Sequence, residues 1–285
     1  MIQSSSSPQH NIPFGAKGFL ISCEVGKEKQ TARDIIRAFL DIYDIKEKPN
    51  NDGDENPKPT TTLLSVEDAL KTEIDTIKEE DKIENKKFKV VDLDLRACIF
   101  ILMSKEALKV MDPSTLVTKY LDEVKKTSRT RSRFIERILP IHDVCFASAD
   151  EIAKHAKPLI EKYLPNVEND GETIEERLKK STFSVIFGSR HNNSVPRMEA
   201  IDAVAQQVNA EFHKVDLGDP RIAFTLDLIK GCCALGVAPE FRKYDKYNAR
   251  ILAMTDEDKA QLKSRNTTMT TKEVADNNDS EEGEK

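Results

Sequence analysis

Apolar and polar residues follow one another along the first half of the chain in a pattern that predicts three strands and two helices. Asp112, followed by Pro113, fits the start of the second helix, because proline is favoured at the first helical position. The order strand, helix, strand, strand, helix predicts a small α/β domain. The predicted strands cover 17–25, 88–93 and 97–103, and the predicted helices cover 27–43 and 112–126.

A second group of elements follows an arginine-rich stretch at 128–141, SRTRSRFIERILPI. We interpret this stretch as a linker and the first strand of a second domain. The pattern then predicts a helix at 148–164, with Ser148 and Glu151 as a capping box. Further strands are predicted at 183–187, 213–216, 222–228 and 232–237.

Three segments are polar rather than periodic. Residues 1–16 are rich in serine, 46–87 begin with KEKPNNDGDENPKPTTT, and 252–285 end in acidic residues. Such compositions bury too little apolar surface to fold alone. We therefore expect a disordered start, a flexible acidic insertion with one candidate helix at 65–80, and a disordered acidic tail. The two expected domains, both of the α/β (α+β) class, cover 17–127 and 128–251.

Composition restricts the class of protein. The chain of 285 residues is 38% hydrophobic and has a net charge of −6, with acidic residues gathered in the first half and the tail. Its longest unbroken apolar run, 97–103, is far too short to span a bilayer, and no secretory signal is recognised at the N-terminus. The five cysteines have no framework spacing, so we expect buried thiols in a reducing compartment.

The stretch FGSRHNNSVPRMEAIDAV joins a predicted strand to a predicted helix. Its turn contains Arg190, His191, Asn192 and Asn193, and Arg197 stands at the helix start. Free N–H groups and partial positive charge at a helix N-terminus already attract anions, and arginines strengthen that attraction. The turn therefore predicts a phosphate-binding site.

Motifs for most kinds of catalysis are missing from the sequence. It contains no glycine-rich phosphate loop, no GxSxG turn and no recognisable site for acetyl-CoA, adenosylmethionine or ATP. His142 and Cys145 have a spacing found in metal sites, but without a second pair we interpret them as buried residues at a strand end. Asp92 and Asp94 are expected on a solvated strand edge rather than in acid–base chemistry.

Taken together, three stretches resemble the THUMP-domain family, and more narrowly its stand-alone members that assist tRNA cytidine acetylation. The first is RFIERILPI at 133–141, which matches an RxxxRxxP-like segment. The second is the strand–turn–helix stretch at 189–208. The third runs from VDLGDP at 215–220 to the KYN tripeptide at 246–248.

The resemblance covers roughly 17–251, since GFLISCEVGKEKQTARDI near the N-terminus fits the family opening. It implies a ferredoxin-like N-terminal domain, followed by a THUMP domain with a small mixed sheet and helices. Most THUMP proteins also carry a catalytic domain, and the two domains and tail expected here leave no room for one. The resemblance therefore favours a non-catalytic protein.

The narrower resemblance implies a tRNA-binding adaptor in the nucleus or nucleolus, with the cytoplasm as a further location. Such an adaptor presents serine and leucine tRNAs to a separate RNA cytidine acetyltransferase, which forms N4-acetylcytidine in the D-arm. No cofactor, metal, membrane or small-molecule substrate is then expected for this chain. The residues expected to contact the tRNA, at its acceptor end and D-arm region, are Arg129, Arg131, Arg133, Arg137, Arg190, His191, Asn192, Asn193, Arg197, Lys246, Tyr247 and Asn248.

We expect the arginines and Lys246 to contact phosphates, and Asn192 and Asn193 to bond phosphate, sugar or a base edge. Tyr247 would stack on a terminal base or pack within the domain. The arginine stretch could instead be a solvated linker, and Arg197 could form surface ion pairs on its own helix. Two other functions stay open: an RNA-modifying enzyme with an unrecognised active site, and a protein scaffold in ribosome assembly.

Overall fold

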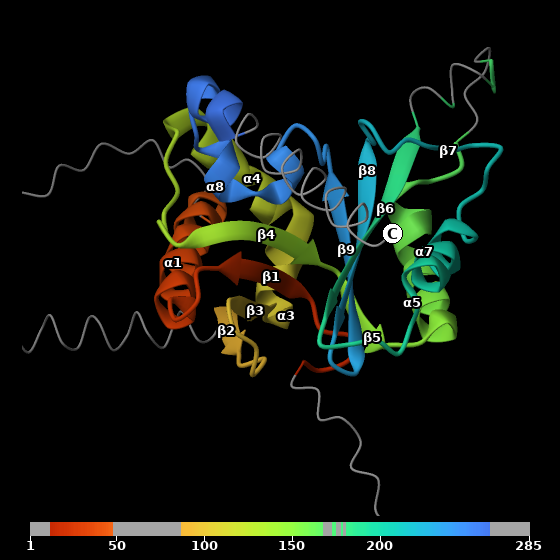
Figure 1. Ribbon diagram of the computed structural model, residues 1–285, viewed down its shortest axis with the longest axis horizontal. Coiled ribbons are helices and arrows are strands. Elements are labelled where there is room, and N and C mark those ends of the chain that lie inside the picture. Colours follow the sequence, from red (N-terminus) through yellow and green to blue (C-terminus); the bar gives the residue numbers. More distant parts are fainter. Residues whose placement is uncertain (1–11, 48–86, 168–172, 175–177, 179–180, 263–285) are drawn as a thin grey trace, which may run out of the picture.

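The computed structural model describes residues 12–47, 87–167, 173–174, 178 and 181–262. Within these ranges the chain forms two β-sheets with helices packed against them (Figure 1). The candidate helix at 65–80 lies outside the described residues, as do most of the predicted disordered start, insertion and tail.

The first sheet is antiparallel and has the strand order β2-β3-β1-β4. Within the described residues, these strands and helices follow one another as a βαββαβ unit, to which the short α3 is added. This is the order of a ferredoxin-like fold, as the resemblance implied. The strands are β1 (Gly18–Cys23), β2 (Phe88–Val91), β3 (Cys98–Met103) and β4 (Ile135–Ile141), and the helices are α1 (Glu28–Glu47), α3 (Lys105–Val110) and α4 (Pro113–Thr127).

Strand β4 departs from the expected domain boundary at 128. It pairs with β1 from Gly18 opposite Ile141 to Cys23 opposite Ile135. The arginine-rich stretch therefore leads into the fourth strand of the first sheet, and not into the first strand of the second sheet. Without this strand, the edge of β1 would be left unpaired. Local periodicity predicted the strand correctly but could not show its partner.

The second sheet is mixed and has the order β5-β9-β8-β6-β7, with β6 parallel to both of its neighbours. The small mixed sheet was expected, although the sequence pattern missed β5 and, in the first half, α3. The elements are β5 (Asp143–Phe146), α5 (Ala149–Tyr163), β6 (Thr182–Arg190), α7 (Arg197–Ala205), β7 (Lys214–Val215), β8 (Ile222–Ile229), β9 (Cys232–Pro239), a short 3₁₀ turn η1 (Asp245–Tyr247) and α8 (Ala249–Leu252).

The second sheet is covered on both faces, which is why every residue of β8 is buried. Helices α5 and α7 cover one face (Figure 1). The core beneath them includes Phe224 and Leu226. Ser148 caps α5 by accepting a hydrogen bond from the Glu151 N–H at 3.4 Å, as predicted.

The other face of the second sheet turns toward the first sheet. Ala223 and Ala234 on this face join the core of the N-terminal half. Strands β4 and β9 approach closely at Gly236, where a Cβ atom would overlap the Thr225 hydroxyl and the Pro140 carbonyl oxygen. The two sheets thus share a packed boundary, and polar residues on that boundary are shielded from water.

All five cysteines are buried and unpaired, which confirms the expectation of buried thiols. Among the described helices, none has the length and apolar character needed to cross a membrane.

Candidate nucleic-acid interface

The turn after β6 is built by Asn192. Its side-chain oxygen accepts hydrogen bonds from the Ser194 N–H at 2.8 Å and the Ser194 hydroxyl at 2.9 Å, and its amide donates to the Lys230 carbonyl oxygen. Asn192 is buried, and His191 before it has a positive φ of 55°. Its side chain therefore holds the turn and the end of β8 together. Asn192 was expected to contact RNA, but its side-chain oxygen and nitrogen both bond within the protein. The exposed neighbours His191 and Asn193 keep free surface.

Arg190, at the end of β6, points toward the boundary between the two sheets. Its Nη2 donates to the Ser22 hydroxyl at 3.2 Å, and its Nε lies 3.8 Å from Oδ1 of Asp227. Burial raises the pKa of Asp227, and the positive charges of Arg190 and Arg137 oppose that rise. Gly188 makes room for this carboxylate, because a Cβ atom there would overlap it. Arg190 therefore balances an internal charge.

Arg197 lies on the opposite side of the same sheet from Arg190. It is the first residue of α7, and α7 packs with α5 on the face away from the first sheet. Arg197 is exposed, and no ion pair joins it to a described carboxylate. The two arginines that the sequence placed in one phosphate site are thus separated by the sheet, because one ends an inward-facing strand and the other starts an outer helix.

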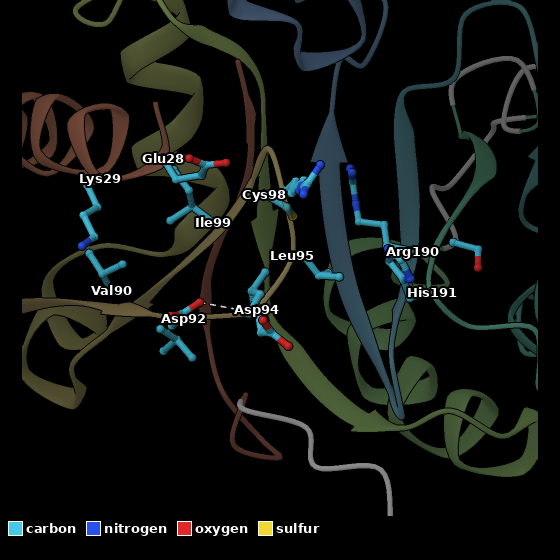
Figure 2. A pocket seen from close by; sticks show the side chains of 14 residues that line it. Glu28, Lys29, Val90, Asp92, Asp94, Leu95, Cys98, Ile99, Arg190 and His191 are labelled. Atoms are coloured by element: carbon cyan, nitrogen blue, oxygen red, sulfur yellow. Dashed lines mark hydrogen bonds between the residues drawn. The ribbon is translucent and has the colours of Figure 1, made fainter. Parts of the chain in front are cut away.

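A cleft of about 1010 Å³ opens between the two halves of the chain (Figure 2). Arg190 and His191 approach it from the second sheet, and Leu95 and Asp94 approach it from the loop after β2. Its lining carries both signs of charge, since Lys29, Arg96 and Arg190 stand with Glu28, Asp92 and Asp94. This mixture gives no net preference for phosphate.

The two aspartates in this cleft, Asp92 and Asp94, are exposed, as expected for a solvated edge. The Asp94 N–H donates to Asp92 at 2.9 Å, and Asp94 pairs with Lys230 at 3.1 Å.

The arginine-rich stretch before β4 has mixed surroundings. Arg131 pairs with Glu123 at 3.1 Å and Asp41 at 3.4 Å, so its charge is already balanced. Arg133 lies 4.6 Å from the centre of the Phe134 ring, where it remains exposed, and Arg129 is exposed. Arg137 is half-buried within β4. Arg129 and Arg133 thus remain available to RNA, and Arg131 does not without breaking its ion pairs.

The KYN tripeptide at 246–248 is mainly structural. Tyr247 is completely buried, stacks on Phe241 at 5.9 Å and donates to the Pro239 carbonyl oxygen at 2.8 Å. Of the two alternatives for Tyr247, base stacking or packing within the domain, the structure shows packing within the domain. Asn248 caps α8 by accepting from the Ile251 N–H at 2.9 Å. Of the three, only Lys246 is exposed.

Lys246 borders a hollow of about 260 Å³ together with Arg137. The same hollow brings in two residues that sequence reasoning did not select, Arg242 and Ser184. Arg242 stands in the RKYDKYN stretch and could have been included on charge alone. Ser184 gave no signal, because a serine within an apolar strand pattern looks like any other outward-facing polar residue.

One cluster contains the residue types of a hydrolase triad, but not its geometry. It consists of Ser114, His142 and Asp112. Nε2 of His142 lies 3.1 Å from the Ser114 hydroxyl and 3.2 Å from the Asp112 carboxylate, while its Nδ1 accepts from the Val237 N–H at 3.2 Å. A triad uses one ring nitrogen for the serine and the other for the carboxylate. The Ser114 hydroxyl is buried and donates to the Val237 carbonyl oxygen at 2.5 Å, so this cluster joins elements and does not present a nucleophile.

His142 and Cys145 are both buried, as expected. In the described part of the chain, no three His, Cys, Asp or Glu side chains gather in a way that could hold a metal ion.

Comparison with known proteins gives the chain its relatives. Residues 146–238 match the THUMP domain family. The chain is 28% identical over 259 residues to THUMP domain-containing protein 1 of Homo sapiens, a match that covers 88% of this chain and 68% of the human protein. It is 26% identical over 271 residues to tRNA acetyltransferase TAN1 of Saccharomyces cerevisiae, covering 86% of this chain and 89% of the yeast protein.

The chain spans 66% of the length of the bovine relative of the same name as the human protein. Among solved structures, the solution structure of the THUMP domain of THUMP domain-containing protein 1 is 27% identical, with a TM-score of 0.23 and coverage of 31% of this chain and 85% of that one. A 4-thiouridine synthetase–RNA complex with bound ATP is 12% identical, with a TM-score of 0.34 and coverage of 79% and 42%.

Proposed function

We propose, from the premise that this chain carries a THUMP domain and is related along most of its length to THUMP domain-containing protein 1 and tRNA acetyltransferase TAN1, that it binds tRNA and takes part in tRNA acetylation. The observation that carries the proposal is the extent of the match to the yeast protein, which covers 86% of this chain. Both domains take part in that match, so the relationship is not limited to the RNA-binding module.

The finer proposal is an adaptor. The chain presents serine and leucine tRNAs to a separate RNA cytidine acetyltransferase, which forms N4-acetylcytidine in the D-arm and carries the acetyl-CoA and ATP chemistry. The nucleus or nucleolus is the proposed compartment. The yeast relative is named a tRNA acetyltransferase. In this proposal, acetyl transfer is an activity of the complex that the chain joins. Among the described residues, the triad-like cluster around Ser114 presents no nucleophile, because the Ser114 hydroxyl is buried and bonded.

Exposed cations supply the RNA contacts in this proposal. Arg129, Arg133 and Arg197 are exposed, and no ion pair joins them to a described carboxylate. Phosphate contacts of this kind give an affinity that falls with salt, at a slope of about −0.9 per neutralised phosphate on a duplex. The ferredoxin-like unit orients the RNA or holds the acetyltransferase.

Titration of a serine tRNA transcript with the purified chain, between about 50 and 200 mM salt, tests the proposal. We expect binding with a steep salt slope, and a weaker slope for the double variant Arg129→Glu/Arg197→Glu. The matched control is Lys105→Glu/Lys119→Glu, which changes the charge equally at exposed sites on α3 and α4. Absence of tRNA binding at the lowest salt would sink the proposal, and the scaffold function would then be favoured.

A further inference from the structure

Three cations surround the hollow of about 260 Å³ that lies between β4, β6 and the segment after β9. Arg137 comes from β4, and Arg242 and Lys246 come from the segment after β9. The described residues that line the hollow include no carboxylate. Arg242 and Lys246 form no ion pair with any described acidic residue, unlike Arg131 and Arg190. The charge of Arg137 acts on the buried Asp227, so the excess positive charge here comes from Arg242 and Lys246.

Two buried polar atoms of the hollow's lining residues have no hydrogen-bond partner. They are the hydroxyl oxygen of Ser184, whose side chain is 1% exposed, and Nε of Arg137. Buried polar atoms nearly always find a partner, and each exception requires an explanation. A hydroxyl and a guanidinium next to further cations are donors that suit one ligand with several acceptor oxygens.

The cations at the rim are held by the surrounding structure. Nη2 of Arg242 donates to the Leu217 carbonyl oxygen at 2.9 Å. Lys246 stands in the middle of three consecutive residues with positive φ, at 49° for Asp245, 58° for Lys246 and 62° for Tyr247. Residues other than glycine seldom adopt even one such conformation. Burial of Tyr247 and the ion pair of Asp245 with Lys259, at 2.9 Å, keep the turn in place.

We propose that this hollow binds a phosphate group of the RNA, with Arg242 and Lys246 neutralising its charge and with Ser184 and Nε of Arg137 donating to phosphate oxygens. The inference rests on the proposed function, because it assigns one phosphate subsite within the tRNA-binding surface. It departs from the turn that the sequence selected, since the arginine of that turn already faces a buried carboxylate. Phosphate contacts fix the register of RNA without reading its sequence.

The test compares variants of the full chain in tRNA binding across a salt series. For Arg242→Gln/Lys246→Gln we expect the salt slope to fall by about 0.7 to 0.9, which is the loss of one neutralised phosphate on single-stranded or duplex nucleic acid. The matched control, Lys105→Gln/Lys119→Gln, removes two exposed charges from α3 and α4 and should leave the slope unchanged. Equal slopes for the two double variants would overturn the inference.

Ser184→Ala provides a second variant that separates binding from folding. It removes a buried hydroxyl that has no partner in the free protein, so we expect the thermal midpoint to stay the same or to rise. We expect tRNA affinity to fall roughly tenfold with little change in salt slope, because a neutral hydrogen-bond donor to a charged group is lost. Unchanged affinity of Ser184→Ala would contradict the assigned role of the hydroxyl.

Two further comparisons separate the subsite from the proposed function and identify which phosphate of the tRNA is bound. If the wild-type chain shows no salt-dependent tRNA binding, the proposed function itself fails. If the wild-type chain binds tRNA but Arg242→Gln/Lys246→Gln has the same salt slope as its control, only the phosphate subsite fails. A transcript from which the 5′-phosphate has been removed distinguishes the source of the phosphate. If the wild-type chain binds that transcript more weakly, and Arg242→Gln/Lys246→Gln binds both transcripts equally, the hollow binds the terminal phosphate. If the wild-type chain binds both transcripts equally, and the double variant still lowers the salt slope, the hollow binds a backbone phosphodiester.

Discussion

Asp227 and Arg190 form a charged contact at the boundary between the sheets. The Asp227 side chain is 8% exposed and the Arg190 side chain is 32% exposed, with 3.8 Å between Oδ1 and Nε. In the sequence, Arg190 has the same appearance as Arg197, because both flank one polar turn. Their different surroundings arise from the strand alternation of β6 and from a carboxylate on β8, more than thirty positions later. The sequence therefore predicted which residues are basic, but not which of them are already paired.

Replacement of Arg190 by glutamine is predicted to destabilise the fold, because it leaves the Asp227 carboxylate buried without its nearest cation. We expect a loss of about 2 kcal/mol in the free energy of unfolding at pH 7. Burial already raises the pKa of Asp227, and loss of Arg190 raises it further. A group with a raised folded pKa destabilises the fold as pH rises, so the loss should shrink as the pH is lowered toward about 4.

Urea unfolding of Arg190→Gln, Asp227→Asn and the double variant at both pH values measures this effect. The double variant should recover part of the stability lost in Arg190→Gln. A loss for Arg190→Gln that is independent of pH would show that Asp227 is not its cause.

At the scale of elements, Asp112 joins α4 to α5. Its carboxylate caps α4 through the Ser114 N–H at 3.2 Å and accepts from the Tyr163 hydroxyl at 2.8 Å and from Lys162 at 3.1 Å, both on α5. The sequence predicted Asp112 as a helix cap, and the structure confirms it. It did not predict the contact with α5, because that contact joins the two groups of elements that periodicity treats separately. The same limit explains why β4 was predicted as a strand but placed in the wrong sheet.

Asp112→Asn is predicted to lower the stability of the fold at neutral pH and to reduce the further loss of stability at acidic pH. Burial alone would raise the pKa of Asp112, but hydrogen bonds from His142, Tyr163 and Lys162 outweigh it and hold the pKa well below the usual range. A depressed folded pKa contributes stability above the unfolded value of about 3.9, and this contribution is lost as pH falls below it. The variant should therefore be less stable at neutral pH and lose less stability on acidification.

Thermal or urea unfolding between about pH 7 and pH 3 measures the difference. The exposed Asp219→Asn, in the turn before β8, is the control and should follow the wild-type profile. If Asp112→Asn and the control have identical pH profiles, the carboxylate does not carry the contact between α4 and α5.

At the scale of the whole molecule, the two sheets share one packed boundary, and cations reach the surface around it. The ferredoxin-like order and the mixed sheet followed from the resemblance, and both are present. The turn after β6 was expected to form a single phosphate site with both arginines. It does not bring them together, because Arg190 and Arg197 lie on opposite faces of the second sheet. The hollow that combines Arg137, Arg242 and Lys246 needs both sheets, so local sequence patterns could not have revealed it.

In the proposed adaptor role, this chain presents tRNA to an acetyltransferase and does not itself transfer the acetyl group. The most direct measurement is the yield of N4-acetylcytidine on a serine tRNA transcript supplied with acetyl-CoA and ATP, using the RNA cytidine acetyltransferase alone, this chain alone, and both together. We predict product only with both proteins, and less product with Arg242→Gln/Lys246→Gln. Product formed by this chain alone, or an equal yield from the acetyltransferase without it, would contradict the adaptor role.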